Sequence, residues 1–361
     1  MKNKFKHVFT FVFVAHFAPL LAQIEPAIIA PDKIWSVQKA NQWYKNYAWI
    51  NGANFLPSTA INQLEMWQKE TFDTNTIDKE LGWANNIGIN TMRVYLHSIA
   101  WRQDAKGFKN RIETYLGIAE RHNIKTIFVF FDDCWNKKAY PGKQPEPKIG
   151  IHNSGWVQDP GDPNSNQPEN YPELQKYVSD ILNHFKTDHR ILLWDLYNEP
   201  GNSGKNKNSL TLLQKVFEWA RAVNPKQPLS AGLWNWEFTE FNAFQALNSD
   251  IITYHNYEEQ PLHQRTINLL QTFAKPLICT EYMARPRNSR FSTILPMLKN
   301  QNIGAINWGL VAGKSNTIYA WDTPLPHGEQ PVEWFHDIFN PDGTAYRNDE
   351  ILLFKKLNSK K

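Results

Sequence analysis

Residues 191–201 read ILLWDLYNEPG, an apolar run followed by Asn-Glu-Pro-Gly. The run Ile191–Leu196 is apolar apart from Asp195, which is typical of a short strand buried within a parallel sheet. Pro200 cannot donate a hydrogen bond to a neighbouring strand, so the strand must end before it. The segment therefore predicts a strand over Ile191–Asn198, with Glu199 held at the strand exit.

The same short apolar pattern recurs along the chain and alternates with segments of helical periodicity. Strands that alternate with helices indicate a parallel α/β sheet. The predicted strands are Ala48–Asn54, Thr91–His97, Lys125–Asp132, Ile191–Asn198, Leu229–Trp234, Ile251–Tyr257, Pro276–Glu281 and Ala305–Leu310. The clearest helices are Asp78–Ile87, Arg111–Asn123, Tyr171–Lys186 and Leu210–Val223, and weaker ones are expected near Glu240–Leu247 and Ser292–Asn300.

Eight strand–helix units predict an α/β fold, a (β/α)8 TIM barrel in a single domain. The chain has 361 residues, and such barrels routinely exceed 250 residues as one domain. The alternative is an open, doubly wound sheet, whose first turn is normally rich in glycine. Residues 52–55 read GANF, which favours the barrel. The segment Ile24–Tyr47 precedes the first strand and is expected to cover one end of it.

The N-terminus has the pattern of a secretory signal peptide. Three lysines among the first six residues precede the apolar stretch Val8–Leu21, and Ala22 precedes Gln23 at a plausible cleavage point. We therefore expect a signal peptide over residues 1–22, a barrel over residues 23–361, and a secreted or periplasmic protein. An uncleaved membrane anchor is the alternative, but the apolar run is short for a membrane span. No other segment is apolar enough to cross a membrane, so we expect no membrane-spanning segment in the chain after cleavage.

Net charge and cysteine content exclude several classes of partner and cofactor. The formal net charge of +4 falls by three, to +1, when the signal peptide with its three lysines is removed, so neither nucleic acid nor an anionic surface is an expected partner. Cys134 and Cys279 are placed on different strands, which makes a disulfide doubtful even in an exported protein. Neither a CxxC nor an HExxH spacing occurs, so we expect no metal and no cofactor. No pattern specifies an oligomeric state.

Two carboxyl groups stand where a barrel enzyme would need them. Cleavage of a glycosidic bond requires one carboxyl group to protonate the leaving oxygen and a second to attack the anomeric carbon or activate water. Active-site residues of these barrels lie at the C-terminal ends of strands. Glu199 follows the fourth predicted strand, and Glu281 ends the seventh, PLICTE at residues 276–281. Taken singly, Glu199 could cap the next helix and Glu281 could be a surface residue; together they indicate a catalytic pair.

The chain resembles glycoside hydrolase clan A, and most closely the cellulase and mannanase family known as family 5. The resemblance rests on Asn198-Glu199-Pro200 at the end of strand four and on Glu281 at the end of strand seven. It implies a retaining β-glycosidase that acts on plant-type polysaccharides or their oligosaccharides. It also implies that Glu199 is the acid/base, that Glu281 is the nucleophile, and that Asn198 contacts the 2-hydroxyl of the sugar.

Four more positions fit the resemblance. An arginine near the end of strand two typically supports the nucleophile, which implies this role for Arg93 in MRVY at residues 92–95. An opposite charge of this kind would keep Glu281 ionised. Strand six often ends in His-x-Tyr, which implies His255 and Tyr257, and strand eight often carries a tryptophan under the sugar, which implies Trp308. All four are expected to bind substrate.

One departure from the family pattern follows strand three. Many relatives have a histidine there, whereas residues 131–135 of this chain read FDDCW. Asp133 and Trp135 are therefore expected to contact the sugar in its place. The segment Trp135–Asn170, rich in Pro, Gly and Asn, is a long connection of the kind that usually serves function, and it is expected to shape the substrate cleft.

Two other functions remain open from the residues alone. A barrel derived from such an enzyme could bind carbohydrate with little or no catalysis, although intact Glu199 and Glu281 argue against this. A metal-dependent hydrolase on the same fold could use Asp132, Asp133, His152 and His255, although no compact ligand spacing supports it. The 15 tryptophans favour a carbohydrate ligand, because aromatic faces pack against the C–H faces of sugars.

Overall fold

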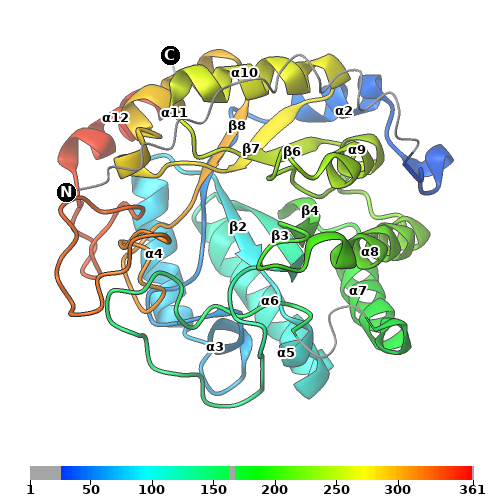
Figure 1. Cartoon of the computed structure of the whole chain (residues 1–361), viewed down its shortest axis with the longest axis horizontal. Coiled ribbons are helices and arrows are strands. Elements are labelled where there is room, and N and C mark those ends of the chain that lie inside the picture. Colours follow the sequence, from blue (N-terminus) through cyan, green and yellow to red (C-terminus); the bar gives the residue numbers. More distant parts are fainter. Residues whose placement is uncertain (1–25, 162–166, 360–361) are drawn as a thin grey trace, which may run out of the picture.

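The protein folds as a barrel of eight parallel strands surrounded by helices (Figure 1). The computed structural model describes residues 26–161 and 167–359, so the predicted signal peptide lies outside the described residues. Seven pairs of neighbouring strands form ladders, in the order β5-β4-β3-β2-β1-β8-β7-β6. A parallel bridge between Leu233 and Tyr254 joins the two remaining edges. The circle of strands confirms the predicted TIM barrel and is incompatible with the open sheet.

The strands are short and buried along nearly their whole length, as expected for parallel strands covered on both sides. The predicted bounds of β3 and β4 agree with the structure, whereas β5 ends four residues early because Leu233 alone makes a further bridge. The strands are β1 Asn51–Asn54, β2 Thr91–Tyr95, β3 Lys125–Asp132, β4 Ile191–Asn198, β5 Leu229–Ser230, β6 Ile252–His255, β7 Leu277–Glu281 and β8 Gly304–Asn307.

The helices lie outside the barrel and turn an apolar face toward the strands (Figure 1). Asn62, Asp73 and Asp104 accept a backbone hydrogen bond at the first turns of α3, α4 and α6, which fixes where these helices begin. The helices are α2 Val37–Tyr44, α3 Gln63–Trp67, α4 Thr74–Asn86, α5 Ser98–Gln103, α6 Ala105–Arg121, α7 Tyr171–Phe185, α8 Leu210–Val223, α9 Thr239–Asn248, α10 Gln260–Leu270, α11 Phe291–Asn300 and α12 Asn348–Asn358. Within the described residues, no helix combines the length and apolarity needed to cross a membrane.

The N-terminal end of the barrel is filled by apolar side chains. Tyr44 of α2 packs in one cluster with Ile127 of β3, Ile278 of β7 and Ile306 of β8. The segment before the first strand therefore covers this end of the barrel, as predicted for its described part. Because these side chains are buried away from water, this end of the barrel contributes stability.

Two long loops meet at the opposite end. The loop after β3 and the loop after β8, residues 308–347, lie side by side (Figure 1). The backbone nitrogen of Asn153 donates to the carbonyl oxygen of Ser315 at 2.8 Å, and that of Leu325 donates to Gly150 at 2.9 Å. These contacts hold the described part of the β3 loop, residues 133–161, against the β8 loop at the C-terminal end of the barrel.

Candidate active site

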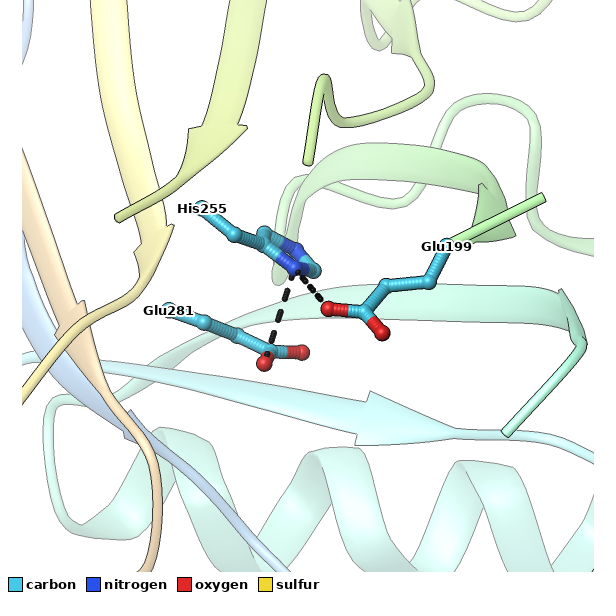
Figure 2. Close-up of side chains that lie close together, drawn as sticks. All are labelled: Glu199, His255 and Glu281. Atoms are coloured by element: carbon cyan, nitrogen blue, oxygen red, sulfur yellow. Dashed lines mark hydrogen bonds and ion pairs between the residues drawn. The ribbon is translucent and has the colours of Figure 1, made fainter. Parts of the chain in front are cut away.

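Glu199 and Glu281 face each other at the C-terminal end of the barrel (Figure 2). A carboxyl oxygen of each glutamate and a ring nitrogen of His255 all lie within 4.8 Å of one another. Glu281 is the last residue of β7, and Glu199 follows the last residue of β4. Glu199 has a φ of 44°, a left-handed conformation that is uncommon for a residue with a Cβ and that recurs at functional sites.

Glu281 accepts three hydrogen bonds, two from residues of β2 across the barrel and one from Tyr257, just after β6. Its Oε1 accepts from Arg93 Nη1 at 2.9 Å and from the Tyr95 hydroxyl at 3.0 Å. Its Oε2 accepts from the Tyr257 hydroxyl at 2.7 Å. A carboxyl group that receives one cationic and two neutral donors is stabilised in its ionised form.

Arg93 is fully buried and connects several strands of the barrel. Besides Glu281, it donates from Nη2 to Asp195 at 2.8 Å and to Asn198 Oδ1 at 2.7 Å, and from Nη1 to Asn54 Oδ1 at 2.8 Å. A guanidinium presents its donors in a rigid planar fork, so it can orient several acceptors at once. Arg93 therefore connects the buried polar residues beneath the site and lies beside Glu281.

Glu199 has a different set of partners. Its Oε1 lies 2.8 Å from Nδ1 of His255, and its Oε2 accepts from the Asn202 amide and, at 3.2 Å, from the Cys134 thiol. Within the described residues, the salt bridges of Arg93 go to Asp195 and Glu281 and not to Glu199. The ionised form of Glu199 is therefore less stabilised than that of Glu281.

Burial changes the protonation of all three groups. It raises the pKa of Glu199, against which the hydrogen bonds from Cys134 and Asn202 act. Burial also raises the pKa of Glu281, and the positive charge of Arg93 and the hydrogen bond from Tyr257 oppose that effect. Burial lowers the pKa of His255 to about 4, so its ring is neutral at neutral pH. Burial thus favours a proton on the pair, and the ion pair of Glu281 with Arg93 favours Glu199 as the group that carries it.

The two glutamates open into a cavity of about 440 Å³, within the range of small-molecule sites. Its lining includes four of the residues expected to bind substrate: Trp135, His255, Tyr257 and Trp308. Trp135 is 38 % exposed, which makes it one of the few large apolar side chains open to solvent. The lining also contains three tryptophans expected in the loops after strands, Trp234, Trp236 and Trp321. Cys134, Asn202 and His336 line it too, and the sequence did not mark them as site residues.

Three of the predicted site residues lie behind the cavity and not on its surface. Arg93 and Asn198 are buried, and both ends of the Asn198 amide are engaged, by Arg93 and by Asp132. Asp133 points into the protein, where it accepts from Lys205 Nζ at 2.8 Å and from the Tyr197 hydroxyl at 2.8 Å. Because both partners are themselves buried, this position of Asp133 speaks against the direct sugar contact expected from its sequence.

The alternative metal set is not brought together. Asp132 accepts from Asn198 and Trp156, and Asp133 pairs with Lys205, while His152 Nδ1 lies 2.9 Å from a backbone oxygen. Among the described residues, the one cluster with ligand atoms close enough for an ion is the Glu199, His255 and Glu281 group. Cys134 and Cys279 are both free, in agreement with the doubt about a disulfide.

A row of four rings lines the cavity. This ring wall consists of Tyr257, Trp321, His336 and His152, whose neighbouring rings lie 4.8 Å (Tyr257–Trp321), 5.5 Å (Trp321–His336) and 5.5 Å (His336–His152) apart. It begins beside Glu281, to which Tyr257 donates, and ends on the β3 loop. The joined β3 and β8 loops supply three of its four members, so the loop predicted to shape the cleft does line the cavity.

Comparison with known proteins identifies the class. The family model Cellulase (glycosyl hydrolase family 5) matches residues 49–314. The protein is a glycoside hydrolase that acts on β-glycosides, with carbohydrate as its substrate. More particularly, the chain belongs to glycosyl hydrolase family 5, as its motifs had suggested. A search of curated proteins gives no match.

Solved structures share the fold at low sequence identity. A GH5_18 protein from Streptomyces cattleya in complex with Manβ1-4GlcNAc has a TM-score of 0.60 at 10% identity, over 86% of this chain and 79% of that one. The endo-β-1,4-mannanase from Thermotoga petrophila has a TM-score of 0.53 at 16% identity, over 87% and 77%. The exo-β-1,4-mannosidase from Opitutaceae bacterium strain TAV5 has a TM-score of 0.61 at 14% identity, over 92% and 62%. The likeness to these three concerns the fold.

Proposed function

We propose that the protein hydrolyses β-glycosides with retention of configuration, by double displacement. The observation that carries this proposal is the approach of Glu199 and Glu281, which places an oxygen of each within 4.8 Å of the other. Retaining enzymes hold their two carboxyl groups about 5–5.5 Å apart, whereas inverting enzymes leave about 6.5–9.5 Å for a water molecule. The short separation supports direct attack by one of the glutamates.

The different surroundings of the two glutamates support a division of roles between them. Glu281, held ionised by Arg93, Tyr95 and Tyr257, attacks the anomeric carbon, while Glu199 donates its proton to the departing oxygen. This step breaks the glycosidic bond and forms a glycosyl ester on Glu281. Glu199, now ionised, removes a proton from water, which attacks the ester and restores both glutamates. The cycle consumes one water molecule and needs no cofactor.

The ring wall supports action at chain ends or on short oligosaccharides. The leaving group departs on the side of Glu199, so the sugar that stays on the enzyme lies on the side of Glu281. Tyr257 donates to Glu281, and the rings of Trp321 and His336 continue the ring wall from Tyr257. A panel of nitrophenyl β-glycosides and plant polysaccharides, with β-mannosides first because of the named structural neighbours, would test the substrate. Release of single sugars or disaccharides is expected, and random internal cleavage of a polymer would contradict the proposal.

Azide distinguishes the two glutamates. Glu199→Ala should still form the ester with an activated aryl glycoside, and azide, which needs no base, should attack that ester and give the β-azide. Glu281→Ala cannot form the ester, so azide entering the vacated space should give the α-azide. The configuration of each product can be read by nuclear magnetic resonance. The opposite pair of products would reverse the two roles.

We also propose that the protein is exported, with cleavage between Ala22 and Gln23, on the strength of the lysine-rich and apolar N-terminal pattern. Expression of the full chain in a bacterium with a secretion pathway, followed by N-terminal sequencing of the exported protein, tests this. A mature chain that begins at Gln23 is expected. A chain that remains in the membrane with Met1 intact would indicate an uncleaved anchor.

A further inference from the structure

The Cys134 thiol stands among polar partners at the edge of the cavity. Its sulfur lies 3.2 Å from Glu199 Oε2 and 3.4 Å from both Asn198 Nδ2 and Asn202 Nδ2. Cys134 belongs to the FDDCW segment in which the chain departs from its family. A thiol can donate one hydrogen and accept weakly, so the orientation of the two amides decides what it does here.

The Asn198 amide can only donate to the sulfur. Its oxygen accepts from Arg93 Nη2 at 2.7 Å, and a guanidinium is never an acceptor. The nitrogen of the amide must therefore face the other way, where it donates to Asp132 Oδ1 at 2.9 Å and approaches the sulfur. No other orientation satisfies Arg93 and Asp132 together.

The Asn202 amide is fixed in the same manner. Its oxygen accepts from the backbone nitrogen of Ser203, so its nitrogen faces Glu199 Oε2 and the sulfur. The thiol hydrogen thus meets two donors and a single acceptor, which is Glu199 Oε2. With the Asn202 amide also donating to that oxygen, Oε2 accepts two hydrogens and leaves no room for a proton of its own.

We propose that Cys134 is a positioning residue, whose S–H, together with Asn202, holds Oε2 of Glu199 as an acceptor so that Oε1 carries the catalytic proton. Oε1 is the oxygen on the side of His255, and His255 in turn lies 3.5 Å from Glu281 (Figure 2). The proton is then held at the side where the glycosidic oxygen must lie for attack by Glu281. This inference rests on the proposed acid/base role of Glu199.

The thiol remains protonated in these surroundings. Burial and the neighbouring carboxylates raise the pKa of Cys134 well above its ordinary value, so it donates S–H over the whole range in which Glu199 titrates. The titratable groups around the Cys134–Glu199 contact are Arg93 and Tyr95 on β2, Asp132 at the end of β3, Asp133 just after it, His255 at the end of β6, Tyr257 just after it, and Glu281 on β7.

The infrared S–H stretch tests the contact without a substrate. The chain has two cysteines, so Cys279→Ala leaves the Cys134 thiol as the sole source of this band. As pH rises and Glu199 ionises, the band should move to lower frequency, because a carboxylate is the stronger acceptor. Adding Glu199→Gln should abolish the movement. A band that does not move with pH, or that moves equally in the Glu199→Gln protein, would overturn the proposal whether or not hydrolysis is found.

Kinetics test the consequence for the proton. Cys134→Ala should lower kcat/KM by about 10-fold for aryl glycosides with poor leaving groups, the effect of one hydrogen bond to a charged group, and leave dinitrophenyl glycosides nearly unchanged. The basic limb of its pH profile should move to higher pH, because the ionised Glu199 loses a donor. Cys134→Ser should restore most of the lost kcat/KM and most of the original pH profile, because a hydroxyl can donate in place of the thiol. Cys279→Ser, the control with the same exchange at the other cysteine, should alter neither kcat/KM nor the pH profile. Equal losses with both classes of leaving group would show a merely structural role.

Discussion

The two ends of strand β7 lie in opposite surroundings. Ile278, near its start, is buried among aliphatic side chains and Tyr44 at the bottom of the barrel. Glu281, at its end, is bound by Arg93 and Tyr257 at the edge of the cavity. Burying charged groups destabilises the folded state, whereas burying apolar groups stabilises it. One end of the strand thus supports the fold, while the other holds a polar arrangement that would not fold by itself.

Strand β4 repeats the contrast. Leu193 belongs to the same apolar cluster as Ile278, and Glu199 follows the far end of the strand. In this barrel, residues at the N-terminal ends of β4 and β7 therefore contribute stability, whereas residues at their C-terminal ends form the site. Substitutions at the two ends should therefore differ in kind, with loss of activity at one end and loss of stability at the other.

The largest effect is expected at the top of β7. Glu281→Ala should lower kcat/KM on the order of 10⁵-fold, because without a nucleophile the glycosyl ester cannot form. Its melting temperature should stay close to that of the wild type. Steady-state rates with aryl glycosides and thermal unfolding measure the two quantities. Activity near that of the wild type would remove Glu281 from the mechanism.

The Asp133→Ala variant tests whether an acidic residue at the C-terminal end of the barrel can serve stability and not substrate binding. It is fully buried and paired with Lys205, so Asp133→Ala should cost about 3–5 kcal/mol of stability by leaving a buried lysine unpaired. Chemical denaturation gives this free energy, and KM for the best substrate should change little in the folded protein. A large rise in KM with unchanged stability would instead support the sugar contact predicted from the sequence.

The bottom of β7 should show the reverse of Glu281. Ile278→Ala should lower the free energy of unfolding by about 2–5 kcal/mol, through lost burial and the cavity left behind. The folded enzyme should keep its kcat/KM. Ile278→Val is the matched control, with an expected cost of about 0.5–1.5 kcal/mol. A loss of turnover that exceeds the loss of folded protein would show that the two ends are coupled.

The smallest expected effect is on stability, and it comes from the free-energy cost of burying Glu199 in its ionised form. Burial raises its pKa above the unfolded value, so the folded state binds a proton more tightly, and the stability that this proton confers is lost as pH rises through the folded pKa. Glu199→Gln should therefore raise the melting temperature slightly at pH 7, with a gain on the order of 1 kcal/mol. The gain should shrink below about pH 4, where both proteins are neutral at this position. An equal gain at both pH values would contradict the argument.

Most of the barrel could be predicted because its elements are local. Short apolar runs fix β3 and β4, and a clear periodic face fixes α8, whose predicted bounds agree with the structure. Helix α10 was not predicted, since its buried face includes His263 and looks polar in sequence. The β8 loop and α12 were also missed, because their contacts with distant elements, such as that of α12 with α11, have no local pattern.

The site was predicted in part for the same reason. Glu199 and Glu281 are visible as acids at strand ends, and Tyr95 could have been found because it lies on the same face of β2 as Arg93, two residues away. Nothing local indicates that Asp133 turns away from the cavity while Cys134 turns toward it. The choice depends on Lys205 and Ser209, which lie more than seventy residues further along the chain.

The sequence itself determines the order of the strands, the ends of β3, β4 and β7, and the presence of an acid at the ends of β4 and β7, because each depends on residues close together in the chain. Tertiary structure alone decides which polar groups meet. Closure of the barrel brings Arg93 to Glu281, and Cys134, Asn202 and His255 to Glu199. The protonation of these groups follows from the contacts, because burial and neighbouring charges, and not the identity of a side chain, set where a proton rests.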